Sequence, residues 1–203
     1  SNNAAQMGGG IFSDEGIEST LINCSFQMNS SQLGGGLYCD DGGVIDFIDC
    51  SFSGNIAESG GGAYHDHSNG SHSYESCEFT NNEATLGDGG GIYVVDVSWQ
   101  FGFSLINCTL NNNSANTSGG GIYILEGYLT LTDCSFINNT ATNGGGGLYG
   151  RGEFDDCEFS DNSTSNGDGG GIFLSNDSSL TNCTLVSNNA AQMGGGIFSD
   201  EGI

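Results

Sequence analysis

Apolar residues alternate with small or polar residues along much of the chain. In the segment 95–105, VDVSWQFGFSL, every second position is apolar: Val95, Val97, Trp99, Phe101, Phe103 and Leu105. A spacing of two is typical of a β-strand, whose successive side chains point to opposite faces, whereas a helix needs spacings of three and four. The pattern therefore predicts short strands joined by bends rich in Gly, Asn and Asp.

This strand pattern recurs with a period of about 24–30 residues, within the range typical of stacked repeat architectures. Each period contains three consecutive glycines followed by an apolar and then an aromatic residue. The glycine triplets begin at Gly8, Gly34, Gly60, Gly89, Gly119, Gly145, Gly169 and Gly194. Glycine tolerates a positive φ without steric cost, so we expect the triplet to form a sharp corner. Each period is then expected to hold two or three short strands.

Each period also carries one Cys, with Phe or Leu two residues later and Asn five residues later. The Cys positions are Cys24, Cys50, Cys77, Cys108, Cys134, Cys157 and Cys183. The Asn positions are Asn29, Asn55, Asn82, Asn113, Asn139, Asn162 and Asn188. Stacked parallel coils would place like residues about 4.8 Å apart. Since an amide is both donor and acceptor, we expect a hydrogen-bonded Asn ladder beside a Cys column.

The motifs GG[A/G][I/L] and FxxN resemble the repeats of the polymorphic outer membrane proteins of chlamydia-like bacteria. FxxN occurs at Phe26–Asn29, Phe52–Asn55, Phe79–Asn82, Phe136–Asn139 and Phe159–Asn162, and a third Gly usually stands where the family has Ala. The resemblance covers the whole chain and implies a surface-exposed or secreted protein with an adhesive or structural role. It also implies the hand of the fold. We predict an all-β, right-handed parallel β-helix (β-solenoid) with about seven coils, each of about 24–30 residues, per 186-residue unit.

The segment SNNAAQMGGGIFSDEGI occurs twice, at 1–17 and at 187–203, so the second copy begins one 186-residue unit after the first. We therefore expect residues 1–203 to form a single continuous β-solenoid: one tandem unit plus the opening segment of the next, 187–203. The expected partners are further copies of the same unit, either covalently in tandem or associated head to tail. Lateral contacts between such fibres would use cations.

Charge narrows the range of partners. The chain has 25 acidic residues, a single basic residue (Arg151) and a formal net charge of −24. Binding of nucleic acid needs Lys and Arg, and so does adhesion to an anionic membrane surface, so we expect neither. The acidic motif GDGGG occurs at 87–91 and 167–171, but we predict only diffuse attraction of Ca²⁺ or other cations and no bound cofactor.

The cysteines allow three interpretations. In an exported protein they could form disulfides, since neighbouring coils bring their Cα atoms within bridging range. They could instead be a stack of free, buried thiols that act as small apolar fillers, or a metal-binding column. We favour the buried thiols. Cys39 lies outside the column and is the cysteine expected to be exposed.

All three histidines lie in the segment HDHSNGSH. His65 and His67 would share one face of a strand, with His72 nearby, and such a set could hold Zn or Cu. The alternative is an ordinary polar loop. Among the Asn-x-Ser/Thr sequences, Asn69 and Asn116 are the better glycosylation acceptors because they stand in bends, whereas Asn29 and Asn162 would be blocked inside the ladder.

These observations favour a structural, non-enzymatic segment of a long acidic fibre, filament or stalk, extracellular or at the cell surface. An adhesin or carbohydrate-binding module is the alternative, and it would need an exposed aromatic patch, for which Trp99 is the candidate. A third class is a polysaccharide-active β-helix enzyme. We do not expect an enzyme, because the acids are spread over all coils and a lyase would want basic residues beyond Arg151.

Overall fold

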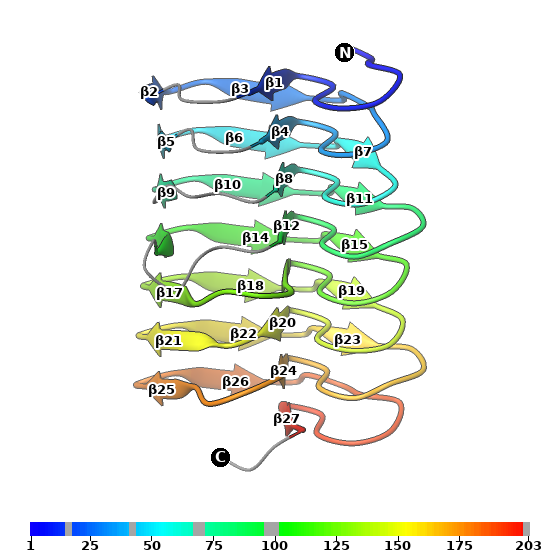
Figure 1. The fold of residues 1–203 in the computed structure, drawn as a ribbon. Helices are drawn as coiled ribbons and strands as arrows, with labels where there is room; N and C mark the ends of the chain where they lie inside the picture. The colour runs from blue at the N-terminus through cyan, green and yellow to red at the C-terminus, as the bar shows by residue number, and fades with distance from the viewer. Residues whose placement is uncertain (15–17, 41–43, 67–71, 96–101, 201–203) are drawn as a thin grey trace.

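The chain folds into a stack of similar coils, each of which runs once around a common axis (Figure 1). The computed structural model describes residues 1–14, 18–40, 44–66, 72–95 and 102–200. Within these ranges all regular structure is β-strand, and every strand pairing is parallel. No helix in this part of the chain could cross a membrane. The predicted all-β parallel solenoid of about seven coils is confirmed.

After the glycine corner, each coil passes first through one sheet and then through a second. The first sheet contains the strands directly after the glycine triplets: β1 (Ile11–Ser13), β4 (Leu37–Cys39), β8 (Ala63–His65), β12 (Ile92–Val94), β16 (Ile122–Ile124), β20 (Leu148–Gly150), β24 (Ile172–Leu174) and β27 (Ile197–Ser199). The second sheet contains the strands before the repeat Cys: β2 (Glu18–Ile22), β5 (Val44–Ile48), β9 (His72–Glu75), β13 (Phe103–Ile106), β17 (Leu129–Thr132), β21 (Gly152–Asp155) and β25 (Ser179–Thr181).

The other two sheets complete each coil. The third sheet follows the repeat Cys: β3 (Ser25–Gln27), β6 (Ser51–Ser53), β10 (Glu78–Thr80), β14 (Thr109–Asn111), β18 (Ser135–Ile137), β22 (Glu158–Ser160) and β26 (Thr184–Val186). The fourth sheet follows the repeat Asn: β7 (Ile56–Ala57), β11 (Glu83–Ala84), β15 (Ser114–Ala115), β19 (Thr140–Ala141) and β23 (Ser163–Thr164). The alternation predicted two or three strands in each coil. The strands of the fourth sheet were not predicted, because two residues are too few to show an alternation.

The register places like residues on like residues. Phe52 pairs with Phe79, Ala57 with Ala84, and Tyr64 with Tyr93. The inward phenylalanines of the third sheet stack with ring centroids 4.6–4.7 Å apart. Together with the inward residues of the first and second sheets they form one continuous hydrophobic core. A coil can bury this apolar face only against its neighbours, so the core exists only in the stack.

The glycine corner needs its three residues for two different reasons. Only the first glycine of each triplet has a positive φ, as in Gly34 at 65°. A Cβ on the second glycine would meet the backbone of the next coil: on Gly35 it would lie 2.4 Å from the carbonyl oxygen of Gly61. The predicted sharp corner is present, but positive φ explains only its first glycine; the second and third are required by the close approach of two backbones.

A second corner stands directly before each repeat Cys, where the residue has a left-handed φ of 52–56°. These residues are Asn23, Asp49, Ser76, Asn107, Asp133, Asp156 and Asn182. Asn and Asp tolerate this conformation better than other residues with a Cβ. The corner turns the chain from the second sheet into the third and leaves the Cys side chain inside the coil.

Candidate functional site

The repeat asparagines form a continuous hydrogen-bonded ladder along the core. The Nδ2 of Asn82 donates to Oδ1 of Asn113 at 2.9 Å and to the carbonyl oxygen of Phe52 at 3.0 Å. The backbone N–H of Asn82 also donates to the same Oδ1 at 3.0 Å. The same pattern of bonds recurs from Asn55 to Asn162. Every amide is thus both donor and acceptor, which is what a buried polar column requires.

The duplicated segment takes part in this ladder at both of its occurrences. Asn2 donates its backbone N–H to Oδ1 of Asn29 at 2.8 Å. Asn188, the same residue one 186-residue unit later, accepts through its Oδ1 from Nδ2 of Asn162 at 3.0 Å. One sequence position therefore supplies the donor on one side and the acceptor on the other.

The repeat cysteines form the expected column, and all of them are free thiols in the structure. The five inner members are buried, and Cys24 and Cys183 are half-buried. The Cys77 thiol donates to the carbonyl oxygens of Glu75 and Phe47, at 3.3 and 3.5 Å, and accepts from the backbone N–H of Cys50 at 3.4 Å. Burial raises the pKa of the Cys50 thiol. The column thiols act as small apolar fillers that also bind backbone groups.

The expectation that Cys39 is exposed was wrong. Its side chain has 0% exposure because it is the third residue of β4 and shares the inward face with Leu37. It pairs with His65 in the next coil, since both residues stand five positions after the first glycine of their triplets. Burial and the nearby Asp40 carboxylate raise the pKa of Cys39 to about 11.

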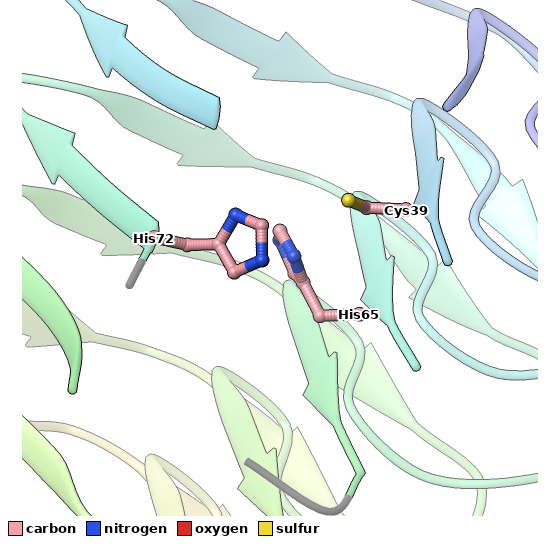
Figure 2. A group of neighbouring side chains, drawn as sticks. All are labelled: Cys39, His65 and His72. Atoms are coloured by element: carbon pink, nitrogen blue, oxygen red, sulfur yellow. The ribbon is translucent and has the colours of Figure 1, made fainter. Parts of the chain in front are cut away.

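Cys39, His65 and His72 gather inside the solenoid where the first and second sheets meet. One ligand-type atom from each lies within 4.8 Å of the other two, and all three side chains are buried. Figure 2 shows the His72 ring facing the ring of His65, with the sulfur of Cys39 directed toward the same space. The ring centroids of the two histidines are 4.8 Å apart. We call these three residues the Cys–His cluster.

Two ring nitrogens in the Cys–His cluster have no hydrogen-bond partner among the described residues: Nδ1 of His65 and Nε2 of His72. The other nitrogens are bound, since Nε2 of His65 lies 2.8 Å from the Tyr74 hydroxyl and Nδ1 of His72 accepts from the Ile45 backbone N–H at 3.2 Å. Burial, with the neighbouring His72 for His65, lowers the pKa of both rings. Both imidazoles are therefore neutral at pH 7.

The three histidines were predicted as one metal-binding set, and the structure brings His65 and His72 together. His67 lies outside the described residues. The third potential ligand is Cys39, which sequence reasoning missed. The sequence held a signal for it, because Cys39 stands at the same repeat position as His65 and equal positions stack in a parallel solenoid. Cys39 also stands two residues after the inward Leu37, so its side chain lies on the same face of the strand.

An aromatic row covers the outer face of the first sheet. We call it the outer aromatic row: Phe12, Tyr38, Tyr64, Tyr93, Tyr123, Tyr149, Phe173 and Phe198. Successive ring centroids lie 4.5–5.6 Å apart. Tyr93, Tyr123, Tyr149 and Phe173 are half-buried. Trp99, the aromatic residue that the sequence singled out, lies outside the described residues.

The acids of the two GDGGG motifs have structural partners in the following coil. Asp88 accepts from the Thr117 hydroxyl and, at 2.8 Å, from the backbone N–H of Ser118. Asp168 accepts from the backbone N–H of Met193 at 2.7 Å. These carboxylates tie one glycine corner to the next, so the motif has a role in stacking.

The two glycosylation candidates differ in what the structure describes. Asn116 is exposed, and its Nδ2 donates to the carbonyl oxygen of Leu86 at 3.3 Å. Asn69 lies outside the described residues. Asn29 and Asn162 are buried in the ladder, where an attached glycan would have no room.

A family model described as a right-handed β-helix region matches residues 35–202. No curated protein matches the chain. The matched region spans most of the coils and all four sheets described above, and its description includes the right-handed sense that the motif resemblance implied.

Proposed function

Because the chain belongs to the right-handed β-helix family, we propose that it is a structural, non-enzymatic segment of a long acidic fibre, filament or stalk. The fibre is built from tandem 186-residue units and lies outside the cell or on its surface. Its strength comes from the same parallel pairing that holds one coil to the next. Its partners are further copies of the same unit.

One observation carries this proposal: the duplicated segment fits both sides of the stack. Asn2 donates to the ladder below it, and its copy Asn188 accepts from the ladder above it. Likewise β1 pairs with β4 through Ile11 and Leu37, and the identical β27 pairs with β24 through Ile197 and Ile172. A coil with this sequence can therefore lie between the seventh coil of one unit and the second coil of the next.

The placement outside the cell rests on motif and charge. The GG[A/G][I/L] and FxxN motifs resemble those of the polymorphic outer membrane proteins, which implies exposure at a surface. A single basic residue, Arg151, leaves trypsin-like proteases almost no cleavage site. The net charge of −24 keeps neighbouring rods apart unless cations screen them.

The first experiment measures the mass of the native material after full denaturation and reduction. A mass of many units, far above 20.8 kDa, supports covalent tandem units. A mass near 20.8 kDa requires head-to-tail association, which electron microscopy of the purified chain would show as rods that lengthen with concentration. Particles of one unit at all concentrations, together with the low mass, would contradict the fibre.

A second candidate function is carbohydrate binding, and the outer aromatic row is the observation that favours it. Neighbouring rings from Tyr64 to Phe173 stack at 13–18° to one another, so their faces are covered, and the ring edges and tyrosine hydroxyls are the groups that would contact a glycan. Glycan-array binding that falls in the double variant Tyr93→Ala, Tyr123→Ala but persists in Thr130→Ala, on the outer face of the second sheet, would establish this role. Release of reducing ends from any glycan would contradict the non-enzymatic assignment.

A further inference from the structure

We propose that the Cys–His cluster binds one soft monovalent metal ion, Cu⁺, through Sγ of Cys39, Nδ1 of His65 and Nε2 of His72. The site lies inside the solenoid and joins two coils and two sheets. It does not depend on the fibre proposed above, because all three ligands come from neighbouring coils of one chain.

The spacing of the three atoms suits a single ion. Metal–nitrogen and metal–sulfur bonds of about 2.0–2.3 Å place the ligand atoms of one ion roughly 3.3–4.0 Å apart. In the structure the Cys39 sulfur and one nitrogen of each histidine ring lie within 4.8 Å of one another. Side-chain rotations that move each ligand atom by up to about 1 Å would therefore bring all three atoms to bonding distance of one ion, without movement of the strands.

The unpartnered nitrogens point to the same ion. Buried polar side-chain atoms nearly always have a hydrogen-bond partner, so each exception asks for an explanation. Here the two exceptions lie in one cluster, on rings whose centroids are 4.8 Å apart, next to a thiol. A metal ion between them would satisfy both nitrogens at once.

The remaining contacts of the rings define the state of each ligand. When Nδ1 of His65 binds the ion, its Nε2 carries the proton and donates to the Tyr74 hydroxyl, an arrangement typical of metal-bound histidine. When Nε2 of His72 binds the ion, its proton moves to Nδ1. The Ile45 N–H then loses its present acceptor.

The choice of Cu⁺ follows from charge balance in a buried space. Cys39 binds as a thiolate and releases its proton to solvent, so one Cu–S bond replaces one S–H bond and no electron is transferred. A thiolate and Cu⁺ sum to zero charge, whereas Zn²⁺ would leave a net positive charge among apolar neighbours such as Ile45 and Phe103. Thiolate and imidazole are also ligands that soft Cu⁺ accepts.

The test refolds the reduced 203-residue chain without oxygen, with Cu⁺ and a competing Cu⁺ chelator present. Native mass spectrometry counts the bound copper, and X-ray absorption identifies its ligands. We expect one copper per chain with two nitrogen ligands and one sulfur ligand. In Cys39→Ser and His72→Gln the bound copper should fall at least tenfold, while Cys50→Ser, a buried column thiol, should keep it.

Three results would overturn the proposal. One is copper bound by sulfur alone and unchanged in Cys39→Ser, which would place the ion on the cysteine column. Another is a wild-type chain that folds, as circular dichroism shows, but retains no copper. The third, in a parallel refolding with equal amounts of Zn²⁺ and Cu⁺, is retention of Zn²⁺ in preference to Cu⁺. Loss of the Ile45 amide's protection from hydrogen exchange on copper binding would support the assigned His72 nitrogen independently of the variants.

Discussion

Among single residues, each ladder asparagine acts as hydrogen-bond donor and acceptor at the same time. Asn113 accepts two hydrogen bonds from Asn82 and donates to Oδ1 of Asn139 and to the carbonyl oxygen of Phe79. A side chain with only donors or only acceptors could not do this. The residue type is therefore dictated by its copies above and below it, since each rung must complete the next.

Replacement of Asn113 by Ala should destabilise the fold strongly. The change leaves the Asn82 amide groups without their acceptor in a buried site, and each unsatisfied group costs about 1–3 kcal/mol. We expect the free energy of unfolding to fall by about 2–5 kcal/mol, measured by denaturant titration. Asn111→Ala, in the same coil but on the outer face of β14, is the control and should change stability by less than about 0.5 kcal/mol.

At the scale of the element, the strands are too short to be stable alone, and the corners decide where they lie. The described strands all have two to five residues. At the glycine corner the coils approach so closely that a side chain does not fit. On Gly120 a Cβ would lie 2.4 Å from the carbonyl oxygens of both Gly146 and Thr140. The corner is therefore a contact between backbones of successive coils.

Gly120→Ala should separate two coils and lower the free energy of unfolding by about 3 kcal/mol or more, because neither backbone can yield without loss of strand pairing. The matched control is Gly102→Ala, where a Cβ would meet nothing within 4 Å. That variant should stay within about 0.5 kcal/mol of the wild type. Equal thermal stability of the two variants would show that the close approach at the corner is not required.

For the molecule as a whole, the net negative charge governs how one rod interacts with another. One unit of seven coils, about 4.8 Å apart, carries a net charge near −22, since Asp14 and Glu15 of the −24 are counted twice. This is about one charge per 1.5 Å of axis, close to the line density of duplex DNA. Rods of this density repel one another at low salt.

Divalent cations should bring the rods together. We expect light scattering of the purified chain to rise on addition of millimolar Ca²⁺ and to return to its starting value with a chelator. NaCl at equal ionic strength, about 0.01 M, should have a weaker effect, because it leaves a screening length of about 30 Å and Na⁺ does not bridge carboxylates as Ca²⁺ does. Scattering that responds equally to both salts would mean that screening alone governs the association.

Much of the fold could be predicted because repetition turns local pattern into tertiary contact. When coils stack in parallel, the partner of Phe52 is the residue at the same place in the next repeat, Phe79. The fourth sheet was missed because strands such as Ile56–Ala57 are too short to show an alternation. The reason for the second and third glycines was also missed, since a close approach of backbones leaves no trace in one coil.

The period, the parallel stacking and the residues of the Asn ladder and Cys column follow from the amino-acid sequence alone, because each depends on comparing one repeat with the next. The Cys–His cluster, by contrast, is visible only in the folded chain. Cys39 and His65 stand at one repeat position, but His72 comes from another sheet. Comparison of equal repeat positions reveals neighbours along one sheet, such as His72 and Phe103, whereas a contact between residues of two sheets is decided by how each coil packs across the core.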